Sequence, residues 1–200
     1  LDGAVNDVEL VERLLVEGFG FAADDVLLLR DAEATLQGVV EAIDRHLVRG
    51  VTPETEVLLW FAGHGSRIRR RDPASGEVGG EDASLVLYDS RVDVDDGSRD
   101  LSDDALHSLL AASPSRYITV VTDACHSGDV TRAAGGGRVA RALPTAEARA
   151  GTDPSAAWPF WPEDVPFLDD DDPRRARALP WIHIAACRTG QAAYESQVGE

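Results

Sequence analysis

The chain has 200 residues, enough for one domain with a sizeable core, and 44% of them are hydrophobic, which excludes a disordered chain. No run reaches the ~18 apolar residues of a membrane helix, and two cysteines are too few for a disulfide-rich secreted scaffold. The net charge of −17 argues against nucleic acid and anionic membranes as partners and is compatible with cationic ligands or a divalent metal. We therefore expect a cytoplasmic protein, with a monomer as the favoured state.

Apolar residues in the first half of the chain recur with helix-like and strand-like spacing in turn. Thr35 is in position to cap the second of the two helices predicted there. The predicted elements are a helix over residues 8–16, a short buried strand over 26–29, a helix over 35–47 and a strand over 56–62.

The second half begins with a stretch that we expect to be irregular, residues 66–80, which carries a basic cluster. Further along, Ser102 is in position to cap a helix whose first turn carries two aspartates. The alternation of strands and helices predicts an α/β domain with a largely parallel sheet and helices on both faces. The remaining predicted elements are a strand over 84–88 as one arm of a hairpin, a helix over 103–110, a strand over 117–122, a long flexible insertion over about 129–178 and a buried strand over 181–186.

Two of the predicted strands end in reactive side chains. His64 lies between two glycines just after the strand over 56–62, and Cys125 follows the strand over 117–122. Chemistry in open α/β sheets sits at the carboxyl ends of parallel strands, so neighbouring strands would bring this imidazole and this thiol to one crevice. A thiol beside an imidazole is a nucleophile near neutral pH. We therefore expect a cysteine peptidase, with the amides of Gly65 and Cys125 as oxyanion donors.

A metal site is an alternative interpretation of the same residue types. The spacing argues against it, because the chain has no Cys-x-x-Cys and no His-x₃-His motif. The zinc-type ligands that the chain offers are His64, Cys125, His126, His183 and Cys187.

The residues around His64 and Cys125 resemble those of the caspase-like cysteine peptidases, and specifically the metacaspases. The resemblance covers most of the chain and implies the caspase-hemoglobinase fold, a three-layer sandwich around a mostly parallel six-stranded sheet. By that comparison the outer strands lie before Leu1 and after Glu200, so we interpret residues 1–200 as a single catalytic domain that is a fragment. Four segments match the family in the right order, namely residues 1–7, 61–65, 123–128 and 185–195.

The resemblance implies an endopeptidase that cleaves after Arg or Lys and needs no organic cofactor. Its acidic pocket positions correspond to Asp7 and Asp123. A pair of carboxylates suits a guanidinium, which makes bidentate hydrogen bonds. Ala4 and Ala62 depart from the family pattern, in which Cys and Ser are common at these two positions.

Many metacaspases are activated by calcium, and the resemblance places that metal at Asp82, Asp103 and Asp104. Calcium takes oxygen ligands, which carboxylates, carbonyls and waters supply together. The fourth family position falls near Arg132, which cannot bind a cation, whereas Asp129 is close by in the sequence. A solvated acidic loop is the alternative interpretation.

Several arginines lie in the insertion over 129–178, where an Arg-specific peptidase would cleave its own chain if the segment is exposed. Self-processing is therefore a further prediction. Two alternatives to the whole interpretation are a non-catalytic caspase-like module that binds partners and a caspase-like peptidase with a non-basic specificity.

Overall fold

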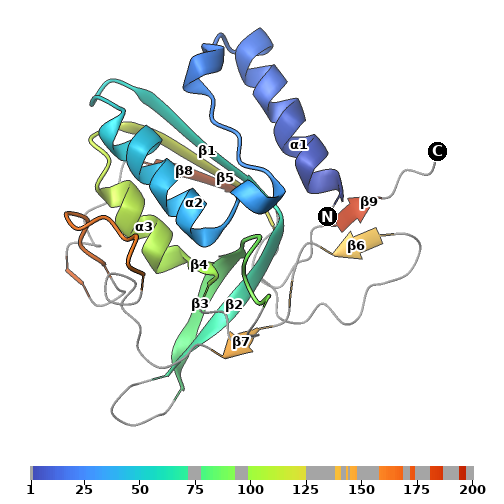
Figure 1. Cartoon of the computed structure of the whole chain (residues 1–200), viewed down its shortest axis with the longest axis vertical. Coiled ribbons are helices and arrows are strands. Elements are labelled where there is room, and N and C mark those ends of the chain that lie inside the picture. The colour runs from blue at the N-terminus through green and yellow to red at the C-terminus, as the bar shows by residue number, and fades with distance from the viewer. Residues whose placement is uncertain are drawn as a thin grey trace.

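A parallel sheet of three strands, in the order β1-β5-β8, lies at the centre of the computed structural model (Figure 1). Its strands are β1 (Glu56–Ala62), β5 (Tyr117–Asp123) and β8 (Trp181–Ala185). The prediction of an α/β domain with a mostly parallel sheet is therefore confirmed. The structure describes residues 2–71, 78–92, 99–124, 138–140, 143, 145–147, 158–168, 172–173, 181–186 and 194–196.

Helices cover the sheet because each presents an apolar stripe to it. Figure 1 shows α2 and α3 side by side on one face, with α1 beside β1. The predicted caps are present: the Thr35 hydroxyl accepts a hydrogen bond from the Gly38 amide at 3.1 Å, and the Ser102 hydroxyl from the Ala105 amide at 3.2 Å. The helices are α1 (Asp2–Arg13) with its wider last turn η1 (Leu14–Gly18), α2 (Leu36–Ala42) with η4 (Ile43–Arg49), and α3 (Asp103–Ala111), together with the single turns η2 (Ala23–Asp25) and η3 (Asp31–Glu33).

The apolar core lies between the sheet and the pair formed by α2 and α3. Every second residue of β1 and β5 points into it, as strand geometry requires. Leu58 points the other way, toward α1, so the helices lie on both faces at β1. The central core residues are Leu36, Val40, Ile43, Val57, Leu109, Leu110, Ile118 and Val120.

A second sheet, in the order β4-β3-β2-β7, extends from the end of β1. The prediction of an irregular stretch over 66–80 is wrong at both ends, because β2 occupies residues 64–71 and β3 begins at Val78. Its side chains alternate: Ser66 and Ile68 are buried, whereas Arg67 and Arg69 point outward and pair with Glu81 across the ladder at 3.3 and 3.1 Å. The strands are β2 (His64–Arg71), β3 (Val78–Val86), β4 (Leu101–Ser102) and β7 (Ala146–Glu147); β6 (Arg138–Ala140) and β9 (Tyr194–Ser196) form a separate antiparallel pair.

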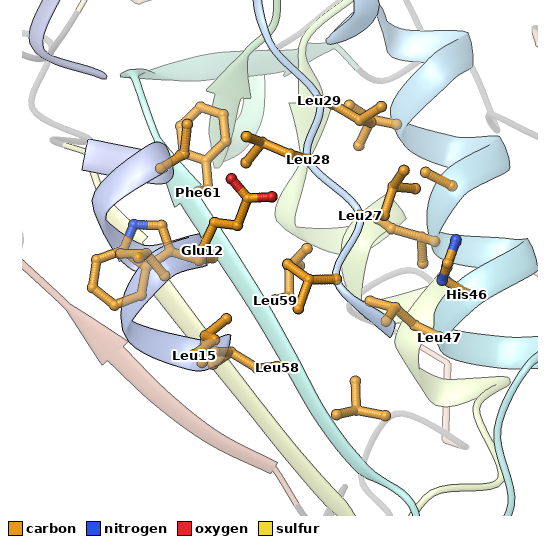
Figure 2. A pocket seen from close by; sticks show the side chains of 18 of the residues that line it. Glu12, Leu15, Leu27, Leu28, Leu29, His46, Leu47, Leu58, Leu59 and Phe61 are labelled. Atoms are coloured by element: carbon orange, nitrogen blue, oxygen red, sulfur yellow. The ribbon is translucent and has the colours of Figure 1, made fainter. Parts of the chain in front are cut away.

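The strand predicted over 26–29 does not form. Its residues are extended but belong to none of the described sheets. An apolar cavity of about 550 Å³ separates them from the edge of β1, as Figure 2 shows, with Leu28 on one side and Leu59 on the other. A strand needs a partner for its backbone groups, and none of the described sheets provides one for residues 26–29.

Part of the long insertion docks on the body of the domain. Trp161 is buried and donates from Nε1 to the Val165 carbonyl at 2.8 Å, and the Leu168 amide donates to the hydroxyl of Ser108 on α3 at 2.8 Å. Most of the rest of residues 129–178 lies outside the described residues, so its predicted flexibility stays a prediction. None of the described helices is long and apolar enough to cross a membrane.

Candidate active site

The carboxyl ends of β1 and β5 meet at one edge of the central sheet. The two strands are parallel neighbours with Ala62 opposite Asp123, and the Gly63 amide donates to the Asp123 carbonyl at 3.3 Å. The two strands are therefore neighbours, which is the condition for the two reactive residues to share one crevice. Gly63, which precedes His64, and Ala124, which precedes Cys125, both lie at this edge.

His64 is the first residue of β2, and Gly63 is the single residue that connects it to β1. A side chain at position 63 would crowd the preceding strand, because a Cβ there would lie 2.8 Å from the Phe61 ring. The His64 side chain is half-buried, and its strand partner is Val86. Cys125 lies two residues beyond Asp123 and is outside the described residues, so the dyad itself stays a prediction.

Gly65, the predicted oxyanion donor, is buried in β2. Its carbonyl accepts a hydrogen bond from the Leu143 amide at 2.8 Å. The Gly65 carbonyl therefore points away from β3. Because the amide and the carbonyl of a residue in an antiparallel strand point to the same side, the Gly65 N–H points away from β3 too. The amide of Cys125, the second predicted donor, is outside the described residues.

The two predicted pocket aspartates come from different elements. Asp123 is the last residue of β5, and Asp7 is half-buried on α1. In Figure 2, Leu15 lies beside Leu58 and Glu12 lies nearer Phe61, so α1 runs antiparallel to β1. The helix residues that precede Glu12, Asp7 among them, therefore lie toward the carboxyl end of β1. Their role as a pocket stays a prediction.

The three predicted calcium ligands lie around the start of α3. Asp82 is buried on β3, Asp104 is buried in the first turn of α3, and Asp103 beside it is exposed. Ser84 pairs with Ser102, the residue that precedes α3, and Asp82 lies two residues before Ser84 on β3. Carboxylates suit calcium. However, no group of three or more potential metal ligands is arranged around one point within the described part of the chain, which therefore supplies at most part of a calcium site.

The alternative zinc site is not assembled by the described residues either. His183 lies on β8, where its Nε2 is 3.0 Å from the Thr122 hydroxyl. Cys125, His126 and Cys187 are outside the described residues.

A buried polar cluster beside His64 was not predicted from the sequence. Arg91 and Asp100 form an ion pair at 2.7 Å with side chains only 8% and 0% exposed, and Ser66 and Ser84 hydrogen-bond to it. The sequence offers one local signal of this cluster: Arg91 is a single basic residue just before a run of aspartates.

A family model of the caspase domain matches residues 1–200. The chain belongs to the caspase-domain family. Curated relatives of this caspase domain are metacaspases. Metacaspase-1 of Yarrowia lipolytica is 33% identical over 136 residues, which cover 64% of the chain and 28% of that protein. Metacaspase-7 of Arabidopsis thaliana is 31% identical over 135 residues, which cover 64% of the chain and 31% of that protein.

The caspase domain is also similar to a solved structure, that of protein GSU0716 from Geobacter sulfurreducens. The two chains share 29% sequence identity with a TM-score of 0.52, and the match covers 70% of this chain and 47% of the other. The predicted metacaspase-type family and its α/β fold are therefore confirmed. The matched region spans about a third of the length of the curated metacaspases.

Proposed function

We propose that this metacaspase-type domain is a cysteine endopeptidase in which His64 and Cys125 form the catalytic dyad. The parallel pairing of Ala62 with Asp123 supports this most directly, because both residues precede a proposed dyad residue by two positions and lie at one edge of the sheet. Membership of the caspase-domain family supports it independently. Hydrolysis of a peptide by the wild type but not by Cys125→Ala tests it.

In the proposed reaction, His64 accepts the proton of Cys125 and the thiolate attacks the peptide carbonyl carbon. The amides of Gly65 and Cys125 donate hydrogen bonds to the resulting oxyanion. His64 then gives the proton to the leaving amine, the C–N bond breaks and a thioester remains. Water, deprotonated by His64, attacks the thioester, which releases the new carboxyl group and returns Cys125 to its starting state.

We further propose that Asp7 and Asp123 select Arg or Lys at the cleaved bond. The expected result is that Asp7→Asn and Asp123→Asn each lower kcat/KM for an Arg peptide by about 10- to 100-fold, because a hydrogen bond to a charged group contributes about 1.5–3 kcal/mol. Steady-state hydrolysis of matched Arg and Asp peptides measures it.

Asp24→Asn is the control for this change, because Asp24 is an exposed aspartate on a separate turn, η2. It should leave both substrates unaffected. Unchanged cleavage of the Arg peptide by Asp7→Asn and Asp123→Asn, or a wild type that prefers the Asp peptide, would favour the peptidase with non-basic specificity.

We also propose that calcium stimulates the enzyme. Asp82, Asp103 and Asp104 would form part of the calcium site, and the remaining oxygen ligands would come from residues outside the described part of the chain or from water. A metal that binds only the native state raises its free energy of unfolding by about 2.7 kcal/mol at a hundredfold excess over Kd. We expect calcium to raise the unfolding temperature of the wild type, and Asp103→Asn, which alters an exposed side chain, to lose most of that rise. Thermal unfolding in calcium and in chelator checks this, and an equal rise in both proteins would contradict the site.

Self-processing within residues 129–178 is proposed as well. The segment around Trp161 and Val165 carries no Arg or Lys and is also held on the body by buried apolar side chains, so we expect cleavage at the arginines on either side of it.

A further inference from the structure

A buried network ties the strand that carries His64 to the loop that follows β3. One guanidinium nitrogen of Arg91, Nη2, donates to the Ser66 hydroxyl at 2.6 Å and to Asp100 Oδ2 at 2.7 Å. The same carboxylate oxygen accepts a hydrogen bond from the Ser84 hydroxyl at 3.0 Å. The network therefore holds β2 through Arg91 and β3 through Asp100.

This network begins immediately beside the candidate catalytic histidine. Ser66 follows His64 by two residues in β2, so the two side chains point to the same face of the strand, about 6–7 Å apart along it. Ser66 pairs with Ser84 directly across the ladder, just as His64 pairs with Val86. The guanidinium thus fixes β2 at the next inward-facing position after His64.

Arg91 is held there at an unusual backbone angle. Its φ is +57°, in the left-handed region that non-glycine residues seldom adopt. A buried ion pair also contributes little net stability compared with apolar side chains of similar volume. Strained residues and buried charges of this kind concentrate at functional sites.

We infer that Arg91 is a positioning residue for His64, an inference that rests on the proposed peptidase function. Arg91 contacts β2 through Ser66 and thereby fixes the start of the strand. His64, which only Gly63 separates from β1, takes its orientation from that fixed strand. Catalytic geometry is sensitive to small displacements, because a shift of about 1 Å can lower a rate by about a hundredfold.

Ser66→Ala and Ser84→Ala form a matched pair that tests this inference. Both serines are 0–1% exposed, and they face each other across the ladder. Within the network, Ser66 accepts a hydrogen bond from Arg91 and Ser84 donates one to Asp100. Ser66→Ala removes the hydrogen bond between Arg91 and the strand of His64, whereas Ser84→Ala leaves that bond in place. We expect Ser66→Ala to lower kcat for an Arg peptide by about 10- to 100-fold with KM changed less than about twofold. Ser84→Ala should keep kcat within about threefold of the wild type, with a similar loss of stability in urea.

Amide hydrogen exchange of residues 62–68, measured by mass spectrometry in a Cys125→Ala background, gives a second readout that needs no activity. Faster exchange in the Ser66→Ala protein than in the Ser84→Ala protein supports the inference. Equal exchange in the two proteins, or kcat values that fall together, would overturn it. A wild type that cleaves no peptide would remove the proposed function, and the exchange comparison would still decide whether Arg91 fixes the start of β2.

Discussion

Replacing His64 by alanine is expected to lower kcat for peptide hydrolysis by about 10²- to 10⁴-fold, the range that general acid–base catalysis contributes. The imidazole has two tasks in the proposed reaction, since it takes the thiol proton and later protonates the leaving amine. Its loss removes both and leaves substrate binding largely intact, so KM should change little. Steady-state kinetics on a fluorogenic Arg peptide measure the effect.

His46→Ala is the matched control, because His46 is also half-buried but lies on η4, beside the apolar cavity. Its kcat should stay close to that of the wild type. Comparable activity of the His64→Ala and His46→Ala proteins, both folded, would exclude His64 as the catalytic base.

Asp100→Ala is expected to lower the free energy of unfolding by about 3–5 kcal/mol. The carboxylate is 0% exposed and is 2.7 Å from the Arg91 guanidinium, so its removal leaves a buried positive charge without its counter-charge. The structure also loses the acceptor of the Ser84 hydroxyl. Urea unfolding followed by tryptophan fluorescence measures the change.

Two further variants separate this effect from a general sensitivity to mutation. Glu54→Ala removes a surface pair with Arg116, in which both side chains are about two-thirds exposed, and should change stability by less than about 1 kcal/mol. The double variant Arg91→Met/Asp100→Leu removes both charges and should recover most of the loss. A loss below about 1 kcal/mol for Asp100→Ala would show that the pair is not buried as described.

The two strands that precede the candidate dyad residues, β1 and β5, could be predicted because each is a continuous apolar run. Such a run is typical of a strand covered on both faces, and Val57 and Ile118 are indeed buried in neighbouring parallel strands. The helix caps at Thr35 and Ser102 could be predicted for an equally local reason, since a hydroxyl at an N-cap satisfies an amide of the first turn.

Two features of the sheets were harder to predict. In β2 the buried residues Ser66 and Ile68 alternate with arginines, as in a half-buried strand. In the sequence, however, the arginines give the same residues the composition of a polar loop. Residues 26–29 have the composition of a buried strand, yet a strand also needs a partner strand, and none of the described sheets includes these residues.

The buried network beside His64 depends on tertiary packing. Arg91 and Asp100 are nine residues apart and meet only because the loop returns to the hairpin of β2 and β3. Nothing local distinguishes Asp100 from the other aspartates near it, which have the composition of a solvated loop. Burial, not sequence pattern, therefore identifies this pair.

The most direct test of the proposed peptidase is hydrolysis of fluorogenic peptides ending in Arg, Lys or Asp, with and without calcium, by the wild type and by Cys125→Ala. We predict cleavage after Arg and Lys that is lost in Cys125→Ala, together with slow self-cleavage that is lost in the same variant. A greater rate in calcium would support the metal proposal as well. Failure of the folded wild type to cleave any of the three peptides would contradict the peptidase and favour a caspase-like module that binds partners.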